Sequence, residues 1–225
     1  MFVKTINLFN PTVLFCDDFL EEEKCDAIVE KAKEQKILQP SQVVDNSDPK
    51  NSVESRFRTS EHGSLAWTDC PEAWEFAQRV SYFLSLRIEQ AEPLQVVRYD
   101  LGQQYEPHLD AFDPNSADHK EYRIGNSGNR VATALLYLTT PIEGGGTVFP
   151  ELIDRSNNSE KRIDAKKGRC VFFTNTYMGL QDPHPHARHG GEPIVKGEKW
   201  ACNLWFRSNI YQPSYQKTEK DSQKG

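Results

Sequence analysis

The sequence has no apolar run long enough to cross a membrane. Its longest apolar stretch, Val131–Leu138, is far shorter than the roughly 20 residues that a transmembrane helix needs. An apolar patch near the N-terminus is interrupted by Asn10-Pro11, and no small-residue cleavage site follows before Asp17. We therefore expect a soluble protein of the cytoplasm, without a signal peptide and without a membrane partner.

Neither sign of charge forms a long block. Lys and Arg number 27 against 33 Asp and Glu, a formal net charge of −6, and the two signs are interspersed. Surfaces that bind nucleic acids or anionic membranes concentrate Lys and Arg instead. We therefore expect no nucleic-acid partner.

The five cysteines lack the paired spacing of a zinc site. They are scattered and odd in number, which also argues against a disulfide framework. We expect reduced and mostly buried thiols at Cys16, Cys25, Cys70, Cys170 and Cys202.

No internal repeat is visible, and 225 residues fit one domain with a single core. We expect that domain over residues 1–215, with a helical N-terminal part over about 1–92 and a β core over about 93–210. The polar residues 216–225 are expected to be a frayed tail.

The N-terminal part predicts a strand, a helix and a loop in turn. Thr12–Cys16 is apolar and β-branched, as in a strand. Asp17-Asp18 then predicts the N-cap of a helix that runs to about Lys36. The polar stretch Ile37–Arg56 predicts a long loop.

A second helix is expected from Pro71 to about Ala91, because proline is favoured at the first helical position. Apolar residues recur there with helical spacing, which predicts one core-facing stripe. The stripe consists of Trp74, Ala77, Val80, Phe83 and Leu84.

From Leu94 the pattern changes to short apolar runs separated by Gly, Pro and Asn. Such runs are typical of a β-sandwich or barrel. They are Leu94–Tyr99, Arg130–Thr139, Arg169–Thr174 and Lys199–Arg207. The fold class predicted is mainly β with flanking helices (α+β), an antiparallel jelly roll or barrel braced from outside by the helices.

His108 and Asp110 stand two apart in the stretch YEPHLD. Alternate residues of a strand point the same way, so both are expected on one face. Two histidines and one carboxylate form the ligand set of non-haem Fe(II) oxygenases. The His-rich stretch 182–191 offers a second histidine at His184, His186 or His189, and composition does not choose among them.

The last apolar run has two different faces. Alternation places Lys199 and Arg207 on one face, and Trp200, Cys202, Leu204 and Phe206 on the other, which we expect to pack against helices. An inward lysine is costly unless an anion meets it. If the metal is Fe(II), the distal carboxylate of 2-oxoglutarate is such an anion. A solvent-exposed polar face is the alternative, but tryptophans on both faces argue against it.

Several long stretches resemble the catalytic domain of collagen-type prolyl 4-hydroxylases, especially the small free-standing bacterial, algal or viral members. The resemblance covers roughly residues 12–207. It is carried by LQVVRYDLGQQYEPHLDAF (94–112), GNRVATALLYLTTPIEGGGTVFP (128–150), KKGRCVFF (166–173), HGGEPIVKGEKWACNLWFR (189–207) and RFRTSEHGSL (56–65). It implies a double-stranded β-helix core that binds Fe(II) and 2-oxoglutarate.

The same resemblance selects among the histidines. In that family the lysine that binds 2-oxoglutarate follows the last iron-binding histidine by ten positions, and Lys199 stands ten after His189. The resemblance therefore implies that His108, Asp110 and His189 hold Fe(II). The other two histidines of the stretch are not implied as ligands.

The resemblance also implies how the cosubstrate and the substrate are held. Tyr99 and Thr147 match positions that hydrogen-bond 2-oxoglutarate beside Lys199. The positions that match the surroundings of the peptide substrate are Tyr105, Arg130, Trp205, Arg207, Arg58, Ser60 and Glu92. Arg207 stands where some relatives carry histidine, and this departure bears on the substrate.

His62 and His119 are expected to be solvated.

The activity implied is 4-hydroxylation of proline in a peptide or protein, with O₂ and 2-oxoglutarate consumed, succinate and CO₂ released, and ascorbate as reductant. The segments 39–56 and 113–129 are long enough to act as lids. Two alternatives remain. One is the same chemistry on a free amino acid or a non-proline side chain, and the other is a non-catalytic, cupin-like binding module.

Overall fold

The computed structural model describes residues 2–40, 42–45, 48–54, 58–116, 124–154, 159–177 and 180–212. For 42–45 and 48–54 the description is limited to the backbone. The predicted tail at 216–225 and His119 lie outside the described residues, as do parts of both predicted lids. The single-domain prediction for residues 1–215 stays a proposal.

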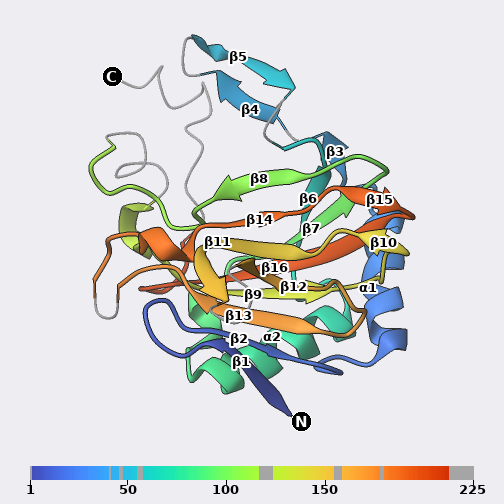
Figure 1. Ribbon diagram of the computed structural model, residues 1–225, viewed down its shortest axis with the longest axis horizontal. Helices are drawn as coiled ribbons and strands as arrows, with labels where there is room; N and C mark the ends of the chain where they lie inside the picture. Colours follow the sequence, from blue (N-terminus) through green and yellow to red (C-terminus); the bar gives the residue numbers. More distant parts are fainter. Residues whose placement is uncertain are drawn as a thin grey trace, which may run out of the picture.

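A sheet of eight antiparallel strands forms the centre of the molecule (Figure 1). Each strand is hydrogen-bonded to the next across the sheet. In spatial order they are β1 (Val3–Asn7), β2 (Val13–Cys16), β13 (Cys170–Thr174), β9 (Arg130–Tyr137), β16 (Lys199–Arg207), β7 (Leu94–Tyr99), β6 (Glu61–Leu65) and β3 (Gln39–Pro40).

A second sheet of four strands completes a jelly roll with the large sheet. Its order is β12 (Ser159–Ile163), β11 (Thr147–Asp154), β14 (His189–Gly191) and β8 (Tyr105–His108). Apolar side chains of both sheets form one buried cluster, in which Phe149 from β11 contacts Phe173 from β13. Two further strand pairs are β10 (Glu143–Gly144) with β15 (Ile194–Lys196), and β4 (Gln42–Asp45) with β5 (Asp48–Glu54). The predicted fold class is confirmed.

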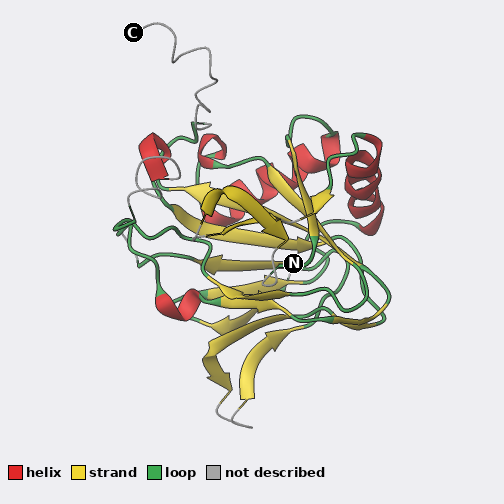
Figure 2. Cartoon of the chain, turned by 90° about the horizontal axis from the view of Figure 1, so that it is seen from above, coloured by secondary structure: helices red, strands yellow, loops and turns green. Residues whose placement is uncertain are grey.

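Two α-helices cover the other face of the large sheet (Figure 2). They are α1 (Glu22–Glu34) and α2 (Pro71–Leu84). Short 3₁₀ turns are η1 (Ile88–Gln90), η3 (Gly125–Ser127) and η4 (Pro185–Ala187). A second apolar cluster fills the space between helices and sheet, and each large side chain fully buried there contributes about 1.5–3 kcal/mol.

The two-faced pattern of β16 is confirmed. Trp200, Cys202, Leu204 and Phe206 all belong to the helix-facing cluster, whereas Ala201 belongs to the cluster between the sheets. All five cysteines are reduced and buried, as predicted.

The predicted ends of both helices were wrong. Helix α1 begins at Glu22, not after Asp17-Asp18, because the Asp17 carboxylate accepts from Arg169 at 2.6 Å and Asp18 has a positive φ of 53°. Helix α2 ends at Leu84, because Ser85 adopts the left-handed conformation. Its fully buried residues are Ala73, Phe76, Ala77 and Val80.

The predicted loop Ile37–Arg56 was also wrong in part, since it contains β3 and the β4–β5 pair. The first 92 residues are not only helical, because β1, β2, β3 and β6 join the large sheet. Among the described residues, no helix is both long and apolar enough to cross a membrane.

Gly63 on β6 allows the chain after α1 to pass close to the sheet. A Cβ atom at this position would lie 2.2 Å from the carbonyl oxygen of Ile37. We predict that Gly63→Ala lowers the free energy of unfolding by about 1–3 kcal/mol, as overpacking does. Denaturant unfolding measures this, with the exposed Ser64→Ala as control within about 0.5 kcal/mol of wild type. Equal stability of the two variants would contradict the packing argument.

Candidate metal centre and cosubstrate pocket

Three predicted ligands meet at one point between the sheets. His108 ends β8, and His189, which begins β14, is its direct partner in the antiparallel pairing. Asp110 follows in the bend after β8, so the predicted strand ends two residues earlier than expected. One ligand atom from each of the three residues lies within 4.8 Å of the others. Both imidazole Nε2 atoms lie 3.6 Å from an Asp110 carboxylate oxygen.

Backbone carbonyls orient the two imidazoles. Nδ1 of His108 lies 2.9 Å from the Glu106 carbonyl oxygen, and Nδ1 of His189 lies 3.0 Å from the Ala187 carbonyl oxygen. A carbonyl can only accept, so Nδ1 carries the hydrogen and Nε2 keeps its lone pair. Both lone pairs are therefore available to a metal, as in metal-binding histidines generally.

The protonation states also suit metal binding. Burial lowers the pKa of His189 to about 4, against an opposing effect of Asp110, so the ring is neutral at neutral pH. Burial by itself would raise the pKa of Asp110, but the adjacent imidazoles of His189 and His108 lower it well below its usual range. The set offers two imidazole nitrogens and one carboxylate.

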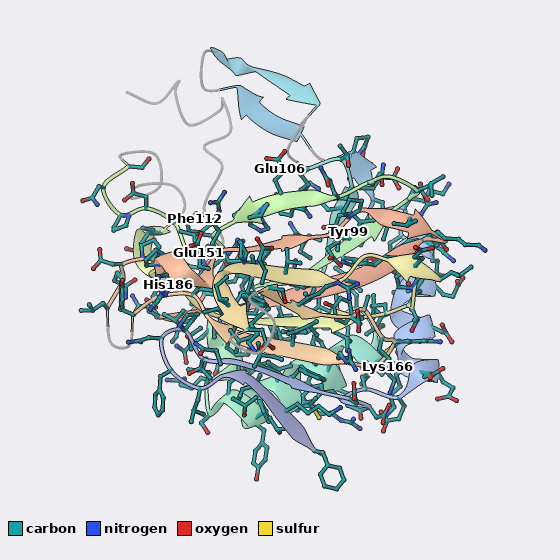
Figure 3. The ribbon with its side chains drawn as sticks, viewed as in Figure 1. Tyr99, Glu106, Phe112, Glu151, Lys166 and His186 are labelled. Carbon is teal, nitrogen blue, oxygen red and sulfur yellow. The ribbon has the colours of Figure 1, made fainter. Side chains whose placement is uncertain are left out.

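A cavity of about 390 Å³ opens beside the three ligands. Tyr99 on β7 and Phe112, both labelled in Figure 3, belong to its wall. Lys199, at the start of β16, is buried at the same cavity with 3% of its surface exposed. Its ammonium donates to the Gly145 carbonyl at 2.8 Å and lies over the rings of Tyr99 and Tyr137.

The Lys199 charge has no carboxylate within ion-pair distance in the described part of the chain. Burial lowers the pKa of Lys199 to about 8, with a smaller opposing effect of Glu192. Thr147 lines the cavity too, and its hydroxyl lies 2.6 Å from the Tyr137 hydroxyl. A buried ammonium beside hydroxyl groups is a receptor for a carboxylate.

The outer part of the cavity has aromatic and guanidinium walls. Arg130 binds Glu92 with two hydrogen bonds of 2.7 and 2.9 Å, and its guanidinium carbon lies 3.4 Å from the ring centroid of Trp205. Arg207 donates to the same Glu92 carboxylate at 2.5 Å. Glu92 therefore fixes two guanidinium groups, of which Arg207 is buried and Arg130 is partly exposed.

The remaining predicted residues lie on the neighbouring wall. Tyr105 stacks on His108, with ring centroids 3.6 Å apart, and Arg58 lies over the Tyr105 ring. Arg58 also donates to the Ser60 hydroxyl at 3.1 Å, and Ser60 hydrogen-bonds Tyr99. Most of the predicted residues line one cavity, whereas Ser60, Glu92 and Arg207 lie behind its wall. His184 and His186 are outside the ligand cluster.

Sequence reasoning missed several residues that hold this site. Tyr137 and Thr133 lie on the cavity side of β9, and the alternation used for β16 would have found them. Asn129 is buried, and its side-chain amide forms two hydrogen bonds with the Phe112 backbone. No sequence pattern predicts this contact. The prediction of a solvated His62 was wrong, because His62 lines the cavity and burial lowers its pKa to about 4.

Comparison with known proteins agrees with this geometry. The sequence profile of the 2OG-Fe(II) oxygenase superfamily matches residues 94–207. Prolyl 4-hydroxylase 2 of Arabidopsis thaliana is 35% identical over 215 residues, which are 89% of this chain and 69% of that protein. Prolyl 4-hydroxylase subunit alpha-1 of Caenorhabditis elegans is 32% identical over 89% of this chain and 34% of the subunit.

The chain belongs to the prolyl 4-hydroxylase family. Its fold is also similar to that of the viral collagen prolyl hydroxylase from Paramecium Bursaria Chlorella virus-1, solved as a complex with 2OG. That likeness has a TM-score of 0.66 and 26% identity, and covers 87% of this chain and 95% of the viral one.

The residues fit the two groups that the prolyl 4-hydroxylase family uses. His108, Asp110 and His189 present the two-histidine, one-carboxylate set of Fe(II) oxygenases. The buried Lys199 ammonium offers the counter-charge for the distal carboxylate of 2-oxoglutarate, with Thr147 and Tyr99 beside it. This protein is therefore an Fe(II)- and 2-oxoglutarate-dependent dioxygenase.

We predict that Asp110→Ala abolishes iron-dependent formation of succinate from 2-oxoglutarate, because it removes the only carboxylate of the three-residue cluster. Succinate release with Fe(II) measures it. Glu106→Ala, which removes an exposed carboxylate two residues before His108, is the matched control and should keep wild-type turnover. Turnover retained by Asp110→Ala would refute the ligand assignment.

We predict that Lys199→Met weakens 2-oxoglutarate binding about 10–100-fold, the loss expected for one hydrogen bond to a charged group. Wild-type affinity should fall as pH rises through about 8, because binding needs the charged ammonium and burial lowers the Lys199 pKa to about 8. Lys199→Met should lack this pH dependence. Calorimetric titration of the Mn(II)-loaded protein measures both, and an unchanged affinity would exclude Lys199 as the carboxylate receptor.

Proposed function

We propose that the protein hydroxylates proline at the 4-position in peptide or protein substrates, releasing succinate and CO₂. The observation that carries this proposal is the joint placement of the three-residue metal cluster and the buried Lys199 at one cavity, in a chain of the prolyl 4-hydroxylase family.

The residues of the cavity fall into two groups, one for the metal and one for the cosubstrate. His108, Asp110 and His189 would hold Fe(II), while Lys199, Thr147 and Tyr99 would hold 2-oxoglutarate beside it. When bound, the metal and cosubstrate supply the oxidising chemistry, in which O₂ and 2-oxoglutarate yield succinate, CO₂ and one oxygen atom for the substrate. The protein positions the reactants and keeps the cavity partly closed to water.

The outer wall suits a proline-rich segment. Proline lacks a backbone N–H, so such a segment offers ring faces and carbonyl acceptors. Aromatic grooves with nearby donors recognise these features. Trp205, Tyr105 and Arg130 supply ring faces and donors here, and the buried indole N–H of Trp205 has no acceptor among the described residues.

Glu92 and Arg207 would support this wall through Arg130, and Arg58, held by Ser60, would line its other side. Ascorbate would keep the iron reduced between turnovers. The lid role of segments 39–56 and 113–129 and the location in the cytoplasm stay predictions.

A panel of proline-rich peptides, incubated with Fe(II), ascorbate and 2-oxoglutarate, tests the substrate. We predict that mass spectrometry detects the gain of one oxygen atom on proline, with stoichiometric succinate. Peptides with alanine in place of proline should show neither. Succinate release that rises only with free amino acids would move the assignment to a small-molecule substrate, and no turnover with any addition would favour a binding module.

A further inference from the structure

A short chain of buried side chains lies behind the Asp110 carboxylate. Thr133 on β9 donates its hydroxyl hydrogen to Asp110 Oδ2 at 2.7 Å. Asn175, directly after β13, donates from Nδ2 to the Thr133 hydroxyl oxygen at 2.8 Å. Thr133 and Asn175 are each 1% exposed, and neither lines the cavity. Their contact with the site therefore runs through Asp110.

The hydrogen bonds from Asn175 through Thr133 to Asp110 all run in one direction of donation. A hydroxyl group carries one hydrogen, and the Thr133 oxygen already accepts from Asn175. The Thr133 hydrogen is therefore left for Asp110. The opposite orientation of the Asn175 amide would place its oxygen against Thr133 and draw that hydrogen away from the carboxylate.

The observed orientation leaves a buried acceptor unsatisfied. Asn175 Oδ1 has no hydrogen-bond partner in the described part of the chain. Buried amide oxygens are normally paired, and an unpaired one lowers stability. An unfavourable group of this kind next to a metal cluster indicates that the amide is retained for the donor at its other end.

Asn175 also connects the second ligand segment. Its backbone N–H donates to Val131 on β9, and its carbonyl accepts from the His184 N–H at 2.8 Å. His184 in turn accepts from the Ala187 N–H, and Ala187 supplies the carbonyl that orients His189. Asn175 thus connects Thr133, which hydrogen-bonds Asp110, with the segment whose backbone carbonyl orients His189.

We propose that Thr133 and Asn175 are positioning residues for the metal centre. They hold the Asp110 carboxylate in one rotation, so that it faces both imidazole Nε2 atoms before any metal binds. The inference rests on the proposed function of the cluster as a metal site. Hydrogen-bond partners of metal ligands typically change metal affinity about 10–100-fold when they are removed.

Binding of Co(II) alone to the metal-free protein tests this without turnover. Titration followed by visible absorption gives the affinity and the ligand-field spectrum. Thr133→Val keeps the shape but removes the hydroxyl, and should weaken Co(II) binding about 10–100-fold. Thr133→Ser, which keeps the hydroxyl, should restore wild-type affinity and spectrum.

The matched control is Thr139→Val. Thr139 follows the same strand, and its hydroxyl accepts from the Trp200 N–H at 2.8 Å, away from the cavity. The Thr139→Val substitution removes one hydrogen bond of a threonine hydroxyl that does not contact the metal ligands, so Co(II) affinity should stay at the wild-type value. Thermal unfolding of the metal-free variants shows whether both fold.

Several results would overturn the proposal. They are wild-type Co(II) affinity in Thr133→Val, an equal loss in Thr139→Val, or no rescue by Thr133→Ser. If Thr133→Val does not fold, Asn175→Leu removes the first donor and leaves Thr133 in place. Asn175→Leu should weaken Co(II) binding relative to wild type, and unchanged affinity in this variant would exclude the positioning role of Asn175 and Thr133.

The same titration separates this inference from the function. If wild type binds no Co(II), or Asp110→Ala binds it equally well, the metal site itself is wrong. If Asp110→Ala loses binding and Thr133→Val does not, the metal site stands and the positioning role fails.

Discussion

The two-residue period of β16 is the constraint on which both core and site depend. Even-numbered side chains from Trp200 to Phe206 pack under the helices, while Lys199 and Trp205 face the cavity. A slip of one residue in the pairing would exchange the two sets. It would place an ammonium in the apolar helix layer and tryptophan at the cosubstrate pocket. The large apolar side chains therefore fix the site's position while they stabilise the fold.

The small sheet contributes the complementary constraint. Because His189 and His108 are direct partners across β14 and β8, two ligands from distant parts of the chain come together through backbone pairing alone. Backbone carbonyls then set the orientation of both rings. The geometry of the two histidines is thus supported by the sheet itself, whereas Asp110, in the bend after β8, is held by the Thr133 hydroxyl.

How much the sequence could predict follows from the range of each interaction. Strand alternation is local, so the faces of β16 were recoverable from a short stretch. His108 and Asp110 do lie together as expected, although the strand ends before Asp110. The choice of His189 over His184 needed the family resemblance, because nothing local distinguishes these histidines. The start of α1 was predicted wrongly because the Asp17 carboxylate binds the distant Arg169 and does not cap the helix. The Asn175–Thr133–Asp110 contacts join three separate segments, so no local pattern contains them.

Arg207, where the resemblance places histidine in some relatives, lies near the outer wall of the cavity and not at the three metal ligands. The Glu92 carboxylate accepts hydrogen bonds from both Arg130 and Arg207, so one acidic side chain holds two guanidinium groups. With histidine in place of Arg207, this second guanidinium contact would be lost. The Arg207 guanidinium lies against Phe112, as Arg130 does, and does not line the cavity at the three metal ligands. Because charge acts on bound groups according to distance, we expect this arrangement to favour a substrate whose carbonyl or carboxylate oxygens lie near Arg130.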